Sequence, residues 1–146
     1  MKTKPLQIQY TYSDLDKVYQ VLTSTDKELH TFFHKHIENE YNGDKSLMLH
    51  YFDIAEIGKF LIDKLKKGDT SKFELFFEKT EEILNHGDAD AQNLIIVGLF
   101  EGIQNIGGKE INYHSSFNKW LKPESKLMWD YLIDFWEGTD WRNSKK

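Results

Sequence analysis

The sequence contains no cysteine, and Arg142 is the only arginine among its nineteen basic residues. The absence of cysteine excludes a disulfide framework, a thiolate nucleophile and a thiolate metal site. The scarcity of arginine disfavours nucleic-acid binding, because bidentate recognition of phosphates and guanines is chiefly made by arginine. The formal net charge is −5, so a basic protein suits this chain better as a partner than a nucleic acid does.

Long hydrophobic runs are also missing. The longest, from Leu94 to Phe100, is interrupted by Gly98 and is far too short to cross a bilayer. The N-terminal stretch M-K-T-K-P-L-Q-I-Q-Y has no apolar core of signal-peptide length. We therefore expect a cytoplasmic chain that does not enter a membrane.

The 146 residues are enough for one domain with a buried core. Apolar residues recur at helical spacing along most of the chain, and no strand-like alternation is longer than Gln7 to Tyr12. The sequence predicts an all-α fold of five or six antiparallel helices, in one compact bundle or a stacked array of helical hairpins. We expect residues 1–146 to form a single domain, with residues 1–12 as a lead-in and residues 139–146 frayed.

Capping signals predict where the helices begin and end. Ser13 with Asp16 resembles a capping box, and Thr25 with Glu28 is a clearer one. A clean helical repeat follows over residues 44–67. Because residues 47–52 are apolar on both sides, the pattern leaves room for a break near His50. Further signals for helix ends are Asn42-Gly43, Gly68, Gly87, Gly107-Gly108 and, for the start of the last helix, Pro123.

The most apolar window runs from Asp88 to Gly108, and after Asp90 it carries one formal charge, Glu101. As a helix it is apolar most of the way round, which is typical of a helix covered on several sides. A lone carboxylate on such a helix has the pattern of a catalytic acid with a raised pKa. Gln104 and Asn105 lie on the same side, so a partly exposed, structural Glu101 is the favoured interpretation.

The helix expected from Ser71 to His86 carries a run of glutamates on one arc, away from its phenylalanines. A charge run is usually a solvated face, and that interpretation is favoured here. The alternative is a negative patch that steers a basic partner. We call this set the acidic arc and include the aspartate that follows it: Glu74, Glu78, Glu81, Glu82 and Asp88.

All four tryptophans lie after residue 116. The last helix has a broad apolar face and a narrow polar stripe, so it is either covered on several sides or partly reserved for a partner. Tryptophan is a typical anchor residue in protein interfaces. Core packing is favoured for Trp129, whereas Trp120 and Trp136 are candidate contacts for a partner.

A metal-dependent enzyme is the main alternative to a binding protein. His30 and His34 are spaced i, i+4, which allows two imidazoles on one helical face to share a metal. A third ligand would have to come from another helix, with His50, Asp53 and Glu56 as candidates. The match to H-E-x-x-H is poor, because no glutamate stands where that motif places its general base. A solvated face is the favoured interpretation, and we expect no metal or cofactor.

Catalytic motifs are absent: there is no phosphate-binding glycine loop, nucleophile elbow, EF-hand loop or dinucleotide fingerprint. We therefore expect no enzymatic activity. A structural subunit of a larger assembly remains a third interpretation, and the oligomeric state is left open.

Residues 70–137 carry a recognisable order of motifs. A glutamate-rich helix is followed by G-D, an apolar Q-N-L-I helix that ends in E-x-x-Q-N, and a W-L-x-P-x-S-x-x-x-W segment from Trp120 to Trp129. This order resembles a family of small, uncharacterised bacterial all-helical proteins that are similar to immunity proteins of polymorphic or contact-dependent toxins. The resemblance implies a cytoplasmic protein that occludes a cognate, basic toxin domain, and it carries over no catalytic residue.

Overall fold

The computed structural model describes residues 12 and 14–143, and within them the fold is all-α, as the sequence predicts. The elements follow in chain order as α1 (Leu15–Thr23), α2 (Lys27–Tyr41), the 3-10 turn η1 (Lys45–Leu47), α3 (His50–Lys67), α4 (Phe73–His86), α5 (Ala89–Asn93), the π-helical segment η2 (Leu94–Phe100), α6 (Glu101–Gly107), α7 (Pro123–Glu137) and the 3-10 turn η3 (Asp140–Asn143).

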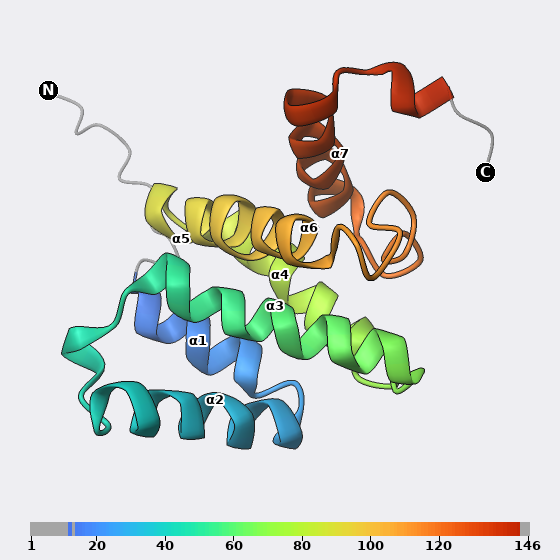
Figure 1. The fold of residues 1–146 in the computed structure, drawn as a ribbon. Coiled ribbons are helices and arrows are strands. Elements are labelled where there is room, and N and C mark those ends of the chain that lie inside the picture. Colours follow the sequence, from blue (N-terminus) through green and yellow to red (C-terminus); the bar gives the residue numbers. More distant parts are fainter. Residues whose placement is uncertain (1–11, 13, 144–146) are drawn as a thin grey trace, which may run out of the picture.

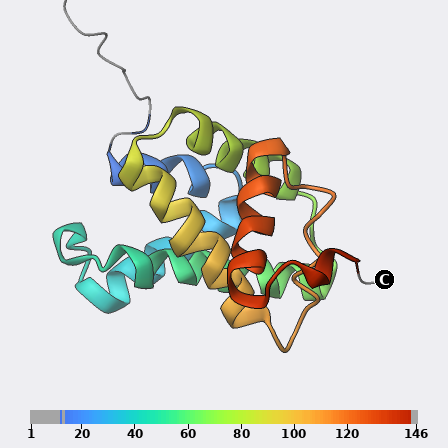
Figure 2. The ribbon, with the colours of Figure 1, turned by 90° about the horizontal axis from the view of Figure 1, so that it is seen from above.

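The elements α5, η2 and α6 join end to end into one helical rod, residues 89–107, which lies on α3 (Figure 1). Helix α2 packs against the other side of α3, and α1 contacts α2, α4 and α5. Helix α7 rises from the rod (Figure 1), and seen from above it lies beside the rod and α4 (Figure 2). None of the helices in the described part of the chain has both the length and the apolar character needed to span a membrane.

The rod is the centre of the hydrophobic core, which confirms the expectation for the window from Asp88 to Gly108. Its residues Ile95, Leu99, Phe100 and Ile103 are fully buried. Glu101 is only partly buried. The sequence did not predict that residues 94–100 form a π-helical segment. An apolar run is compatible with both the α-helical and the π-helical period, so its pattern does not distinguish the two.

Glycine allows α3 and the rod to approach closely. A Cβ atom placed on Gly98 would lie 2.7 Å from Cγ2 of Ile54 and 3.3 Å from Cδ1 of Tyr51. Real Cβ atoms essentially never approach another atom as closely as 2.7 Å, so no larger residue fits at Gly98 unless Ile54 or its surroundings shift. Gly102, one turn later, meets nothing nearer than Cβ of Ala55 at 3.9 Å.

The N-terminal caps differ from the predicted ones. Asp26, not Thr25, caps α2, since its carboxylate accepts a hydrogen bond from the backbone N–H of Glu28. The Thr25 hydroxyl instead donates to the carbonyl of Leu22 at 2.7 Å. Asp14 caps α1. The predicted box at Ser13 falls outside the described residues, as does most of the 1–12 lead-in.

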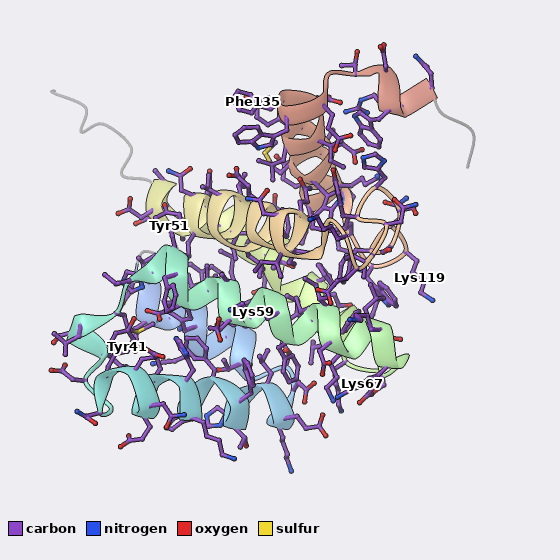
Figure 3. All side chains as sticks on the ribbon, in the orientation of Figure 1. Tyr41, Tyr51, Lys59, Lys67, Lys119 and Phe135 are labelled. Carbon is purple, nitrogen blue, oxygen red and sulfur yellow. The ribbon has the colours of Figure 1, made fainter. Side chains whose placement is uncertain are left out.

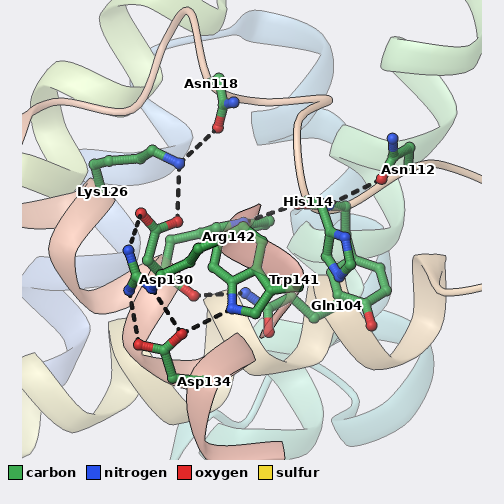
Figure 4. Close-up of polar contacts among 11 residues, drawn as sticks. Gln104, Asn112, His114, Asn118, Lys126, Asp130, Asp134, Trp141 and Arg142 are labelled. Atoms are coloured by element: carbon green, nitrogen blue, oxygen red, sulfur yellow. Dashed lines mark hydrogen bonds and ion pairs between the residues drawn. The ribbon is translucent and has the colours of Figure 1, made fainter. Parts of the chain in front are cut away.

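The break that the sequence allowed near His50 is present, because η1 ends at Leu47 and α3 begins at His50. Pro123 occupies the first turn of α7, as predicted. Of the tail expected to be frayed, residues 139–143 contact α7, and residues 144–146 lie outside the described residues. The guanidinium of Arg142 donates two hydrogen bonds to Asp134, and the indole N–H of Trp141 donates to the same carboxylate (Figure 4).

Replacing Gly98 by alanine should lower the free energy of unfolding by about 1–3 kcal/mol, because the added methyl overpacks the contact with Ile54. Urea denaturation measures the change. The matched control is Gly102→Ala, which we expect to raise stability by about 0.5–1 kcal/mol, since alanine favours the helix and fits the space. Equal effects of the two substitutions would contradict the close approach at Gly98.

Candidate protein-binding surface

Four large apolar side chains stand exposed where the chain enters α3. Leu47, Leu49, Tyr51 and Phe52 are each more than half exposed to solvent, and Tyr51 lies beside the start of the rod (Figure 3). Contiguous exposed apolar surface in a soluble protein marks an interaction site. We call residues 47–52 the 47–52 patch.

The 47–52 patch borders an open groove with a volume of about 520 Å³. Leu15 of α1 and Leu94 of the rod form part of its apolar lining, together with Met48. Exposed Asp90 lies on the groove and supplies a carboxylate. The surface therefore combines apolar anchoring with negative charge.

A buried carboxylate lies beneath this surface. Asp53 is completely buried, and its oxygens accept hydrogen bonds from the Nε2 of His36 at 2.7 Å and from the hydroxyl of Tyr41 at 2.8 Å. A buried carboxylate without such partners would be strongly destabilising. The three residues therefore tie the C-terminal half of α2 to the first turn of α3.

Two tyrosine hydroxyls extend this network to the backbone of the patch. The backbone N–H of Leu49 donates to the Tyr41 hydroxyl at 3.3 Å, at a helix start that has no side-chain cap of its own. The Tyr19 hydroxyl donates to the carbonyl of His50 at 3.0 Å. The backbone is thus held from inside while the side chains of Leu49 and Tyr51 face solvent, so the patch is preorganised.

The protonation of both tyrosines suits this role. Burial, and then the hydrogen bond to Asp53, raises the pKa of Tyr41, while burial, and then the negative charge of Asp53, raises the pKa of Tyr19. Both hydroxyls therefore remain protonated at neutral pH and keep donating.

The acidic arc proves to be largely engaged within the chain. Glu81 accepts hydrogen bonds from the backbone N–H groups of Glu124 and Ser125 at 2.9 and 2.8 Å, and from the Ser125 hydroxyl. Helix α7 has no cap of its own at Lys122, so Glu81 serves as its N-terminal cap. An anion at a helix N-terminus also interacts favourably with the helix dipole.

Other members of the acidic arc have similar structural contacts. Glu74 pairs with Lys122, Glu82 accepts from the hydroxyl of Tyr12 at 2.8 Å, and Asp88 caps α5. Glu78 is exposed. Contact between this arc and a partner stays a prediction, and Glu78 is the member whose carboxylate is most open to one.

The two candidate tryptophans lie in different environments. Trp120 is buried, with its ring centroid 4.9 Å from that of Phe73, whereas Trp136 is 62% exposed. A role for either in partner binding stays a prediction. Trp129 is fully buried, which confirms the core packing expected for it. Trp136 belongs to an exposed row on α7 that we call the α7 stripe: Leu127, Tyr131, Phe135 and Trp136.

The histidine pair finds no third ligand. His30 and His34 stack on the exposed face of α2 with ring centroids 4.9 Å apart. Of the suggested third ligands, Asp53 binds His36, His50 contacts Tyr19, and Glu56 pairs with Lys59. Across residues 12 and 14–143, no three His, Cys, Asp or Glu side chains are grouped so that they could hold a metal ion.

Comparison with known proteins identifies the family. A family described as "Domain of unknown function (DUF7674)" matches residues 19–137. The chain belongs to this family. The matched range contains the 47–52 patch, Asp53 and all of α7. No curated protein and no solved structure matches the chain.

Sequence reasoning did not single out Leu49, Tyr51 and Phe52 as candidate binding residues. The signal was present, because residues 47–52 are apolar on both sides and no amphipathic helix buries both sides. Leu49 precedes the first residue of α3, whereas Tyr51 and Phe52 lie in its first turn with their side chains exposed.

Replacing Tyr41 by phenylalanine should lower the free energy of unfolding, because it removes the hydrogen bonds to Asp53 and Leu49. Amide hydrogen exchange at Leu49 should accelerate in the same variant. Tyr51→Phe, on the exposed patch, is the matched control and should change stability by less than about 0.5 kcal/mol. An unchanged exchange rate at Leu49 would show that the tyrosine does not hold the patch.

Acidification should release the cap at the start of α7. Burial raises the pKa of Glu81, but its hydrogen bonds to Glu124 and Ser125 outweigh burial and leave the pKa below its usual 4.5. The stabilisation is therefore complete above that value and lost as pH falls through the lowered pKa. Glu81→Gln should cost about 1 kcal/mol at pH 7 and progressively less as the pH falls through the lowered pKa, measured by urea denaturation. Glu78→Gln is the control and should show no such pH dependence.

Proposed function

We propose that the chain is a cytoplasmic protein-binding protein without enzymatic activity, and that its partner docks on the 47–52 patch. One observation carries the proposal: exposed apolar side chains border a groove of about 520 Å³, and Tyr41, which is hydrogen-bonded to Asp53, also accepts a hydrogen bond from the backbone of the 47–52 patch at Leu49. A preorganised surface loses little conformational entropy on binding, which favours affinity.

The surface indicates the chemistry of the partner. The apolar lining of the groove fits an aliphatic or aromatic anchor, and exposed Asp90 beside it favours a basic residue next to that anchor. The formal net charge of −5 would accelerate encounter with a basic protein.

The narrower proposal is that the chain is a bacterial immunity protein that neutralises a cognate toxin by occluding it. The resemblance of residues 70–137 to such proteins supports it, as does the scarcity of arginine in an acidic chain. Exposed Glu78 offers a second negative contact on α4. The carboxylates that cap helices, Glu81 and Asp88, are less suited to that contact because they are already hydrogen-bonded.

The test uses the protein encoded immediately upstream of this chain. We expect its expression alone to arrest growth, coexpression with this chain to restore growth, and calorimetry to show a one-to-one complex. A Tyr51→Ala/Phe52→Ala variant should bind at least about tenfold more weakly, since exposed aromatic anchors carry much of an interface's energy. Leu75→Ala removes an exposed apolar residue of α4 and serves as the control.

Two results would contradict the proposal. If the upstream product is harmless, or if this chain does not restore growth, the immunity role is excluded. If binding is intact in the Tyr51→Ala/Phe52→Ala variant and lost in Glu78→Lys, the partner docks on the acidic arc instead of the patch.

A further inference from the structure

The outward face of α7 is a second apolar surface, separate from the 47–52 patch. Leu127, Tyr131 and Phe135 follow at four-residue intervals, opposite the buried Trp129 and Ile133. Phe135 projects from the part of α7 that stands clear of the rod, well away from Tyr51 (Figure 3).

The exposed area of the α7 stripe is large for an uncovered surface. Its members are 57–67% exposed, and large side chains of this kind present 150–250 Å² each, so the stripe offers roughly 450 Å². Two such faces packed together would bury at most roughly 900 Å², just below the total of about 1,000 Å² that a stable interface clears, so the area suits a weak, reversible contact.

The charges beside the α7 stripe are already balanced within the chain. Asp130 pairs with Lys126 at 2.8 Å, and Asp134 pairs with Arg142 at 2.7 Å (Figure 4). Glu137 is held by His114. A basic partner would therefore have to displace existing ion pairs, whereas a second α7 stripe would bring its own balanced charges.

The spacing of the stripe makes it complementary to itself. If two α7 helices pack antiparallel about a two-fold axis at Tyr131, Leu127 of one copy faces Phe135 of the other, and the two Tyr131 side chains meet at the axis. Such a contact uses the same residues on both copies, which is how most homodimers close. We propose that the chain forms a homodimer through antiparallel packing of the α7 stripe, with the 47–52 patch free on each copy.

The chain contains no cysteine, so engineered cysteines report this geometry directly. Facing positions near a two-fold axis between packed helices come within disulfide range. Under mild oxidation Tyr131→Cys should form a cross-linked dimer at least about tenfold faster than Leu75→Cys, an exposed position on α4. Leu127→Cys mixed with Phe135→Cys should cross-link faster than either variant alone, because the proposed packing pairs those two positions.

Light scattering on the purified chain tests the dimer without any cross-link. We expect a dimer at micromolar concentration, and Phe135→Glu should raise its dissociation constant on the order of 100-fold by placing a charge in the contact. Leu127→Glu gives a second disruption at the other end of the stripe, and circular dichroism checks that both variants are folded.

If the wild-type chain stays monomeric at every concentration up to about 100 µM, the proposal is overturned. A dimer that survives both glutamate substitutions, or Tyr131→Cys cross-linking no faster than Leu75→Cys, would also overturn it by placing the contact on another face. Each measurement uses this chain alone, so its outcome is independent of the toxin-binding proposal.

Discussion

The close approach of α3 to the central rod is the constraint on which the rest of the structure depends. A Cβ on Gly98 of the rod would collide with Ile54, and a Cβ on Gly58 of α3 would lie 3.2 Å from Cγ1 of Ile103. Each element thus presents a glycine to an isoleucine of the other. Because packed interiors tolerate little change in volume, this pair of contacts fixes how closely α3 and the rod approach each other.

The position of α3 in turn decides the geometry of the candidate surface. Its first turn brings Asp53 against α2, where His36 and Tyr41 satisfy the buried carboxylate. The same hydroxyl of Tyr41 holds the backbone of Leu49. The packing of α3 on the rod therefore positions Asp53, and the hydrogen bonds around Asp53 in turn hold the backbone of the exposed 47–52 patch.

The glutamates of α4 show why a charge pattern alone identifies a binding surface poorly. On the sequence, Glu74, Glu78, Glu81 and Glu82 are equivalent members of one arc. In the folded chain Glu81 caps α7, which begins 42 positions further along the sequence, while Glu78 remains exposed. The difference between a structural and an available carboxylate comes from what the tertiary fold places opposite each one.

The sequence by itself determined the all-α class, the central place of the Asp88–Gly108 window, the start of α7 at Pro123 and the burial of Trp129. These follow from local periodicity, capping chemistry and apolar content, which act over a few residues. Tertiary structure alone decided that Asp53 pairs with His36 rather than supplying a metal site, that Glu81 caps α7, and that Leu49, Tyr51 and Phe52 face solvent. Those outcomes depend on contacts between distant segments, whose geometry local sequence patterns do not encode.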